Sequence, residues 1–286
     1  MKRPQEIEHE IVGMQTLSEL TNVFEGIASM RIAQIKNQVL QSQNYFDTLW
    51  QMYIQIRAGT PFSFGRHLLE ESKDVIDKEL FIVITAEGGF SGDIDQKLIS
   101  WMLKSYDKDK NDIIVIGHHG AIQLAQRGVS FKKYFKLPSK DQNINVTPII
   151  REVQNYKSTN VFYQTYISLT VQDVKRISLS NAVEEQGKDV EQGKEVINEA
   201  TYIFEPSSFA VVDHLERSMM NIALSQVILE SKLAQYASRF QAMSAAHNRA
   251  NDSVGELKLM YNRSRRAIKD ERLKEIINGL RKAAHV

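Results

Sequence analysis

The sequence contains no cysteine, and this absence excludes two kinds of structure. Without thiols the chain can form neither disulfide bridges nor thiolate metal sites. It also lacks an apolar run of 18 residues, so it predicts no transmembrane helix. Residues Met1 to Glu10 have neither the apolar core of a signal peptide nor the composition of a transit peptide, so we expect the mature chain to start at or near Met1.

The chain also lacks a large net charge of either sign. The formal net charge is +1 over 286 residues, which argues against generic binding to nucleic acid or to membrane surfaces. With 42% apolar and 25% charged residues, the composition is that of ordinary soluble proteins. The length suffices for one compact domain plus an extended part.

Proline and glycine are almost absent from the last quarter of the chain. No Pro follows Pro206, and Gly255 is the only Gly between there and Gly279. We therefore predict one continuous helix from Phe209 to about Ala284. At about 1.5 Å per residue it would be roughly 110 Å long, so it must protrude from its own domain or lie inside another body.

This helix carries a narrow apolar stripe. From Val212 to Ile268 apolar residues recur at alternating steps of three and four. A mean step of 3.5 residues is typical of a helix that packs against another helix along its length. The predicted seam includes Leu229, Leu233, Tyr236, Phe240, Met243, Leu257 and Tyr261. Three polar residues interrupt the stripe: Gln226, His247 and Ser264.

A second long helix is predicted from Gln5 to about Arg57, with its own apolar residues at helical spacing. Pairing the two helices in antiparallel fashion lets both ends of the chain form one stalk while the middle folds separately. The predicted parts are an N-terminal stalk helix (residues 1–58), a linker (59–79), an inserted α/β domain (80–206) and a C-terminal stalk helix (207–286).

The middle of the chain has the pattern of a parallel α/β sheet. Continuous apolar runs at Leu80–Thr85 and Ile113–Gly117 predict buried strands, each followed by an amphipathic helix, at about Asp93–Ser105 and Ala121–Arg127. Further elements are predicted for the rest of the insert: a helix at Pro148–Tyr156, strands at Val161–Leu169 and Val171–Leu179, and a short strand at Tyr202–Phe204. The two strands near residue 170 have no helix between them, so they must be antiparallel. The fold class is therefore α/β, a long antiparallel coiled coil with an inserted Rossmann-like domain.

Two segments flank this last strand. The polar stretch Glu184–Glu199 predicts an exposed loop, whose role the sequence does not indicate. Ser207 or Ser208 then supplies the N-cap of the long helix.

Several motifs in the insert approach a catalytic pattern without matching it. The GGFSG turn, Gly88–Gly92, sits where phosphate-binding loops sit, but it matches neither GxGxxG nor the P-loop. Ser91 lacks the last Gly of a nucleophile elbow.

The segment Gly187–Glu195 has the wrong spacing for a Walker motif. His118 and His119 have no accompanying ligands at metal-site spacing, so we interpret them as a turn after the second strand. The sequence predicts no catalytic, cofactor or metal site.

Basic residues gather at the C-terminal end. From Lys258 onward there are nine basic and three acidic residues, a local balance of +6. Such a run is usually a solvated helix face, but here it begins where the long helix should lose its N-terminal partner. An acidic protein partner is therefore an equally good interpretation.

Six segments resemble the gamma subunit of F-type ATP synthases, the last of them Leu273–Leu280, which parallels its LxEIVGGA motif. Met14–Ser29 (MQTLSELTNVFEGIAS) is similar to that family's N-terminal pattern, and Ile84–Asp95 resembles its ITSDRGLCGGLN loop. Val115–Gly120 resembles its IGxKG turn, and Tyr202–Ser207 its YxFEPS motif. Ser238–Ala267 is similar to ARxxAMxxATxNAxxxIxxLxLxYNxARQA. The resemblance covers nearly the whole chain. Departures such as Glu8 and Glu10, where the family usually has basic residues, indicate a divergent member.

The resemblance implies a central rotor shaft that binds no cofactor of its own. Its partners would be the alpha and beta subunits that surround the shaft, the epsilon subunit and the membrane c-ring, on the cytoplasmic face of a bacterial plasma membrane. It implies that contacts to the beta subunit, which couple rotation to catalysis, come from Met30, Arg31, Arg239, Arg265 and Arg266. Two rival hypotheses are a coiled-coil adaptor with an α/β binding module and a small α/β hydrolase acting at Ser91.

Overall fold

The computed structural model describes residues 2–57, 76–141, 144–179, 203, 205 and 207–283. These fall into two compact units, a larger one of residues 28–239 and a smaller one that combines residues 1–27 with 240–286. The predicted loop at Glu184–Glu199 and the Walker-like segment Gly187–Glu195 lie outside the described residues. Of the predicted strand at Tyr202–Phe204, the structure describes only Ile203, which is exposed.

The larger unit is built on a mixed sheet. Within the described residues it has five strands in the order β3-β2-β1-β4-β5. Their bounds are β1 Ile76–Ile84, β2 Asn111–Ile116, β3 Lys133–Phe135, β4 Tyr156–Tyr166 and β5 Gln172–Ser178. Strands β1 to β4 run parallel to one another, whereas β5 pairs with β4 in antiparallel fashion. Both predicted strand directions are therefore confirmed. The sequence did not predict β3, which adds a short parallel edge beside β2.

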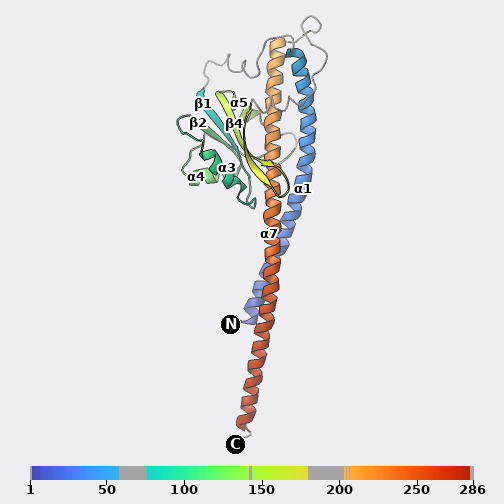
Figure 1. Ribbon diagram of the computed structural model, residues 1–286, viewed down its shortest axis with the longest axis vertical. Coiled ribbons are helices and arrows are strands. Elements are labelled where there is room, and N and C mark those ends of the chain that lie inside the picture. Colours follow the sequence, from blue (N-terminus) through green and yellow to red (C-terminus); the bar gives the residue numbers. More distant parts are fainter. Residues whose placement is uncertain are drawn as a thin grey trace. The chain divides into compact units, whose positions relative to one another are not determined.

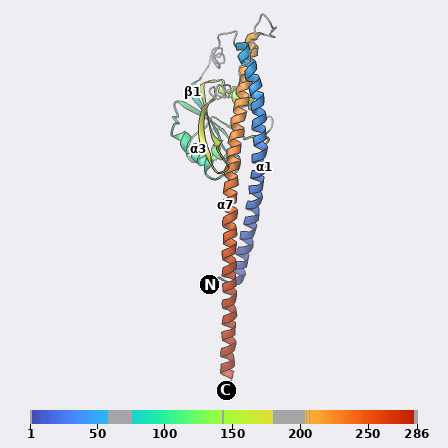
Figure 2. The same ribbon diagram turned by 45° about the vertical axis from the view of Figure 1, so that its right-hand side comes forward.

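Helices cover both faces of the sheet (Figure 1). Their bounds are α1 Pro4–Arg57, α3 Ile94–Leu103, α4 His118–Gln126, α5 Thr147–Val153 and α7 Ser208–Ala283. Alternate residues of β1 point to opposite faces, because successive side chains of a strand do so. Phe81 and Val83 pack with α3 and α4, whereas Leu80, Ile82 and Ile84 pack with α1, α5 and α7. The result is a three-layer arrangement in which the sheet lies between α3 and α4 on one face and α1 and α7 on the other (Figure 2).

Two glycines after β2 allow the chain to approach Thr85, at the carboxyl end of β1, more closely than other residues could. Gly117 has a φ of +101°, and a Cβ atom there would lie 2.1 Å from the carbonyl oxygen of Thr85. A Cβ atom on Gly120 would lie 2.5 Å from Thr85 Oγ1, which instead accepts the Gly120 N–H at 2.9 Å. The IGHHG turn therefore needs glycine at both positions for a steric reason.

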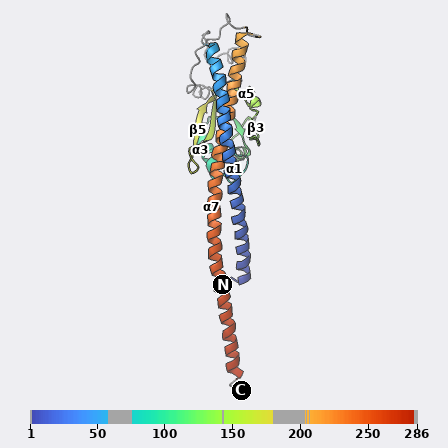
Figure 3. The ribbon, with the colours of Figure 1, turned by 90° about the vertical axis from the view of Figure 1, so that its right-hand side faces the viewer.

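The two long helices are antiparallel in each unit (Figure 3). Helix α7 begins directly after Ser207. The Ser207 hydroxyl oxygen accepts a hydrogen bond from the Ala210 N–H at 3.1 Å, as expected for the predicted N-cap. In the larger unit Tyr53 of α1 donates its hydroxyl hydrogen to Glu216 of α7 at 3.0 Å. Aromatic residues of α1, Phe46, Trp50 and Tyr53, share a buried core with α7.

The smaller unit pairs the first residues of α1 with α7 through polar groups at seam positions. His247 Nδ1 lies 2.9 Å from the Ser18 carbonyl oxygen, and the Ser18 hydroxyl donates to Asn251 at 2.7 Å. Farther along, the Ser264 hydroxyl donates to the Lys2 carbonyl oxygen at 3.0 Å. The polar interruptions His247 and Ser264 are thus partnered across the helix pair. Beyond them α7 continues, and residues 269–280 are all exposed.

The predicted seam residues differ in burial along α7. Leu229, Leu233 and Met243 are buried, whereas Tyr236, Phe240, Leu257 and Tyr261 are partly buried. Between residues 227 and 237 burial extends well beyond the narrow predicted stripe. It includes Ala234, Ala237 and the polar residues Ser231, Lys232 and Gln235, because this part of α7 faces both α1 and the α/β domain. None of the described helices carries an apolar stretch long enough to cross a membrane.

Leu233 tests the seam, because its side chain is 7% exposed. Leu233→Asp should lower the free energy of unfolding by roughly 3 to 5 kcal/mol, the cost of an uncompensated buried charge. Leu233→Met keeps the apolar volume and should cost less than about 1.5 kcal/mol. Urea unfolding of the whole chain followed by circular dichroism measures both. Equal unfolding midpoints for the two variants would contradict the placement of Leu233 in the seam.

Candidate functional site

The residues predicted to contact a partner lie in both units. Met30, Arg31 and Arg239 belong to the larger unit, and Arg265 and Arg266 to the smaller one. Met30 is 62% exposed, and Arg265 and Arg266 are exposed on the surface of α7. Within the described part of the chain neither Arg265 nor Arg266 forms an ion pair.

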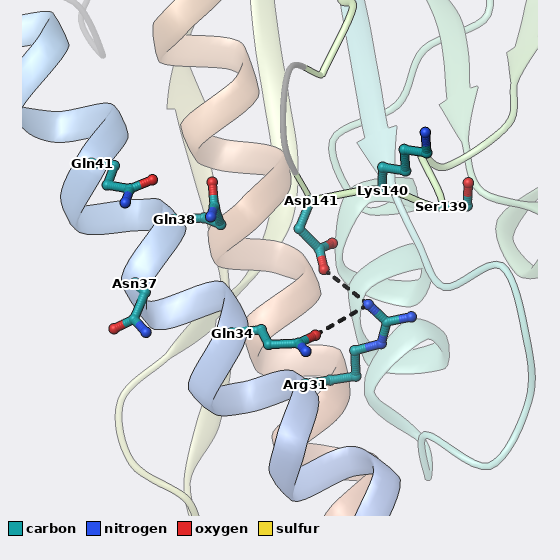
Figure 4. A pocket seen from close by; sticks show the side chains of 8 residues that line it. All are labelled: Arg31, Gln34, Asn37, Gln38, Gln41, Ser139, Lys140 and Asp141. Atoms are coloured by element: carbon teal, nitrogen blue, oxygen red, sulfur yellow. Dashed lines mark hydrogen bonds and ion pairs between the residues drawn. The ribbon is translucent and has the colours of Figure 1, made fainter.

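Arg31 has a partner inside its own chain. Its Nη1 atom lies 3.4 Å from Asp141 Oδ2 and 3.3 Å from Gln34 Oε1. Figure 4 shows the guanidinium group turned from α1 toward the loop that carries Asp141. The sequence indicated Arg31 only as a partner contact, and this ion pair was not predicted.

The same carboxylate also binds α7. Lys232 Nζ pairs with Asp141 Oδ1 and donates to the Pro138 carbonyl oxygen at 2.8 Å. The side chains of Lys232 and Asp141 are only 4% and 8% exposed. A buried pair of this kind contributes little net stability, but removing one partner leaves an unpaired buried charge at a cost of about 3 to 5 kcal/mol.

A polar groove lies beside this ion cluster, with a volume of about 520 Å³. It is lined by Arg31, Gln34, Asn37, Gln38, Gln41, Ser139, Lys140 and Asp141. Amide, hydroxyl and cationic groups therefore face it from α1 and from the loop (Figure 4). Such a lining suits hydrogen bonding to a polar surface.

Arg239 holds the GGFSG turn against α7. Its guanidinium group donates to the carbonyl oxygen of Gly89 at 3.2 Å and to that of Gly88 at 3.4 Å, and it lies over the Tyr236 ring. The neighbouring Ser238 hydroxyl donates to the Ser91 carbonyl oxygen at 2.6 Å. The turn that resembled a phosphate loop is thus bonded to α7 through three of its carbonyl groups.

Ser91 is placed poorly for attack on a substrate. The residue is 1% exposed, and its hydroxyl oxygen has no hydrogen-bond partner among the described residues. A nucleophilic serine needs both access to substrate and a base within hydrogen-bond reach. This geometry weighs against the hydrolase hypothesis.

His119 belongs to a buried network, and the interpretation of His118 and His119 as a simple turn was wrong. They begin helix α4, and His119 Nδ1 lies 2.8 Å from Oδ2 of the buried Asp95 on α3. The hydrogen bond and charge of Asp95 raise the pKa of His119 above its ordinary value, against an opposing effect of burial. One sequence signal could have found the pair: both residues begin helices that follow adjacent parallel strands, whose carboxyl ends meet at one edge of the sheet.

The network continues from Asp95 to α7. Gln164 of β4 donates to Asp95 Oδ1 at 2.6 Å, while its own carbonyl oxygen accepts from Ser231 and Gln235 of α7. A chain of hydrogen bonds therefore runs from α3 through the sheet to the long helix. These directional bonds fix how α7 sits on the sheet.

Comparison with known proteins identifies the family. A family model described as ATP synthase matches residues 3–282. The chain belongs to the ATP synthase family. Curated ATP synthase gamma chains of Halothermothrix orenii and Chlorobium limicola are 24% and 26% identical to it. These alignments cover 98% and 96% of this chain and 98% and 96% of the relatives, so the resemblance to gamma subunits is confirmed.

Solved ATP synthase structures share the fold. A chain of the Euglena gracilis mitochondrial ATP synthase in an OSCP, F1 and c-ring structure has a TM-score of 0.64 at 14% identity, covering 99% of this chain and 94% of its own. A chain in the rotor structure of the same organism's enzyme has a TM-score of 0.61 at 15% identity, covering 93% of this chain and 98% of its own. These two chains thus share the fold of this chain over most of its length.

His119 gives a pH test. A pKa raised by folding adds stability that is fully present below the unfolded value of about 6.5 and is lost as pH rises through the folded value. Between pH 8 and pH 6 the wild-type chain should gain unfolding free energy relative to His119→Gln, by less than about 1 kcal/mol because water screens the part-exposed ring. Chemical unfolding at both pH values measures this difference. His118→Gln, which leaves the Asp95 contact in place, should behave as wild type; identical pH dependence in all three proteins would contradict the assignment.

Proposed function

We propose that this chain is the central rotor shaft of an F-type ATP synthase, the gamma subunit of its complex. It couples rotation of the membrane c-ring to the conformational cycle of the catalytic beta subunits, during ATP synthesis or hydrolysis. The observation that carries this proposal is the match to gamma chains along nearly the whole chain. The arrangement of two terminal helices around an inserted sheet supports it.

In this proposal the alpha and beta subunits surround the helix pair, and the α/β domain meets the epsilon subunit and the c-ring. The complex lies at the cytoplasmic face of a bacterial plasma membrane, and this chain is peripheral to that membrane. The nucleotide sites belong to the neighbouring subunits, so the chain acts without a catalytic site or cofactor of its own.

The two rival hypotheses have less support from the structure. A coiled-coil adaptor would form homodimers through the seam of α7, but α1 of the same chain already packs on α7 in both units. A hydrolase would act at Ser91, but this side chain is buried.

Coupling through the basic end of α7 has a simple physical basis. Arg265 and Arg266 are exposed on a helix surface that carries several other cations. A charge-assisted hydrogen bond from such a group to a partner carboxylate or carbonyl contributes about 1.5 to 3 kcal/mol. If the bond forms at only some rotor angles, it changes the relative energies of the rotary states without affecting the fold.

Arg265→Ala tests the proposal in a complex assembled with the alpha and beta subunits. ATP hydrolysis should fall about tenfold or more, corresponding to a loss of about 1.5 kcal/mol or more of state-dependent contact. The melting temperature of the isolated chain should not change, because the side chain is exposed. ATPase assays and thermal unfolding measure the two quantities.

The matched control is Arg263→Ala, which removes an exposed cation two residues away and should hydrolyse ATP as wild type does. Wild-type turnover in both variants would make Arg265 an ordinary surface charge. Failure of the wild-type chain to assemble with alpha and beta subunits would overturn the proposed function itself.

A further inference from the structure

Asp141 connects the α/β domain, by which we mean residues 76–179, to both long helices of the larger unit. Its Oδ1 atom pairs with Lys232 of α7, and its Oδ2 atom pairs with Arg31 of α1. Figure 4 shows Asp141 on its loop, facing α1. One carboxylate thus bonds three segments that are far apart in the sequence.

Most of the contact between the domain and the helices is apolar. Leu80, Ile82 and Ile84 of β1 share a buried cluster with Met219 and Ala223 of α7. Apolar burial is strong but non-directional, so it resists separation of two surfaces better than it resists their sliding or turning against each other. A surface that must transmit torque therefore needs directional contacts as well.

The Lys232–Asp141 pair supplies such a contact. Both side chains are more than nine-tenths buried, and Lys232 also donates to the Pro138 carbonyl oxygen. Moving α7 by one helical turn, about 5.4 Å, would separate the Lys232 ammonium group from both acceptors. It would leave that buried charge unpaired and Asp141 with the half-exposed Arg31 as its remaining ion-pair partner. Arg31 restrains α1 in the same way but more weakly, because its side chain is 41% exposed and water screens it.

We propose that Asp141, held by Lys232 and Arg31, locks the α/β domain in place on the helix pair and so carries torque between them. This inference rests on the proposed function, in which the helices turn within the head and the domain is attached to the c-ring. Asp141 is a positioning residue: it touches no nucleotide and acts through the two helices. The lock matters only when the domain works against a load.

The test compares loaded and unloaded turnover of the assembled complex. Asp141→Asn removes the charge and keeps the shape. ATP hydrolysis by the detached head, in which no c-ring is driven, should stay close to wild type. ATP-driven ion pumping by the membrane-bound complex against an established gradient should fall about fivefold or more, as expected for the loss of a coupling contact.

Two further variants sharpen the test. The exchange Asp141→Lys with Lys232→Asp reverses the buried pair and should restore part of the pumping lost in Asp141→Lys alone. The restoration should stay partial, because the new lysine faces Arg31. Lys104→Gln removes an exposed cation at the end of α3, outside the groove, and should pump as wild type. Arg31→Gln, at a half-exposed position where folding is secure, should show a smaller loss under load than Asp141→Asn.

The outcomes separate this inference from the proposed function. Wild-type pumping under load by both Asp141→Asn and Arg31→Gln would overturn the lock, because the apolar core and the other hydrogen bonds between α7 and the domain would then suffice. An equal loss of hydrolysis in the detached head would also overturn it, because the defect would not depend on load. If the wild-type chain neither assembles with alpha and beta subunits nor supports pumping, the proposed function fails before Asp141 is tested.

Discussion

The burial of one sheet face against the two long helices is the interaction on which the larger unit depends. An isolated helix gains little from its own hydrogen bonds, because most helical stability in proteins comes from packing an apolar face. Here α7 buries Met219, Ala223, Leu224 and Ile228 in the same cluster as alternate residues of β1 and β2. The sheet in turn has an apolar face that these helices and α5 cover, together with loop residues such as Leu137 and Val146. Neither layer would be stable in water without the other.

Helix α7 meets different surroundings along its length, and its sequence changes with them. Where it faces both the α/β domain and α1, small or polar residues such as Ala234, Ser231 and Gln235 are buried and paired. In the smaller unit it pairs with α1 through a narrower contact that includes His247. Past Ile268 it is exposed and rich in basic residues. A single helix thereby combines a buried segment, anchored on the sheet, with an exposed segment.

Much of the fold could be predicted from sequence because its signals are local. The apolar runs of β1 and β2 and the three-and-four spacing of α7 depend only on neighbouring residues, and both predictions are confirmed. The strand β3 was missed because it has three residues and no buried core position. The pairs His119–Asp95 and Lys232–Asp141 join residues 24 and 91 positions apart, so no local pattern indicates them. The first pair could be found only through the sheet topology, and no such signal exists for the second. The contacts of Arg265 and Arg266 with a partner stay a prediction.

Native-state hydrogen exchange along α7 tests the central claim, that its partners rather than its own sequence set its stability. In the isolated chain, amides of residues 215–237 should exchange only through global unfolding, those of residues 243–261 should open more readily, and those of residues 269–280 should exchange fastest. Mass spectrometry of peptides across the helix gives the three rates. Uniform protection from residue 215 to residue 280 would contradict the account, because it would show a helix that is stable without its partners.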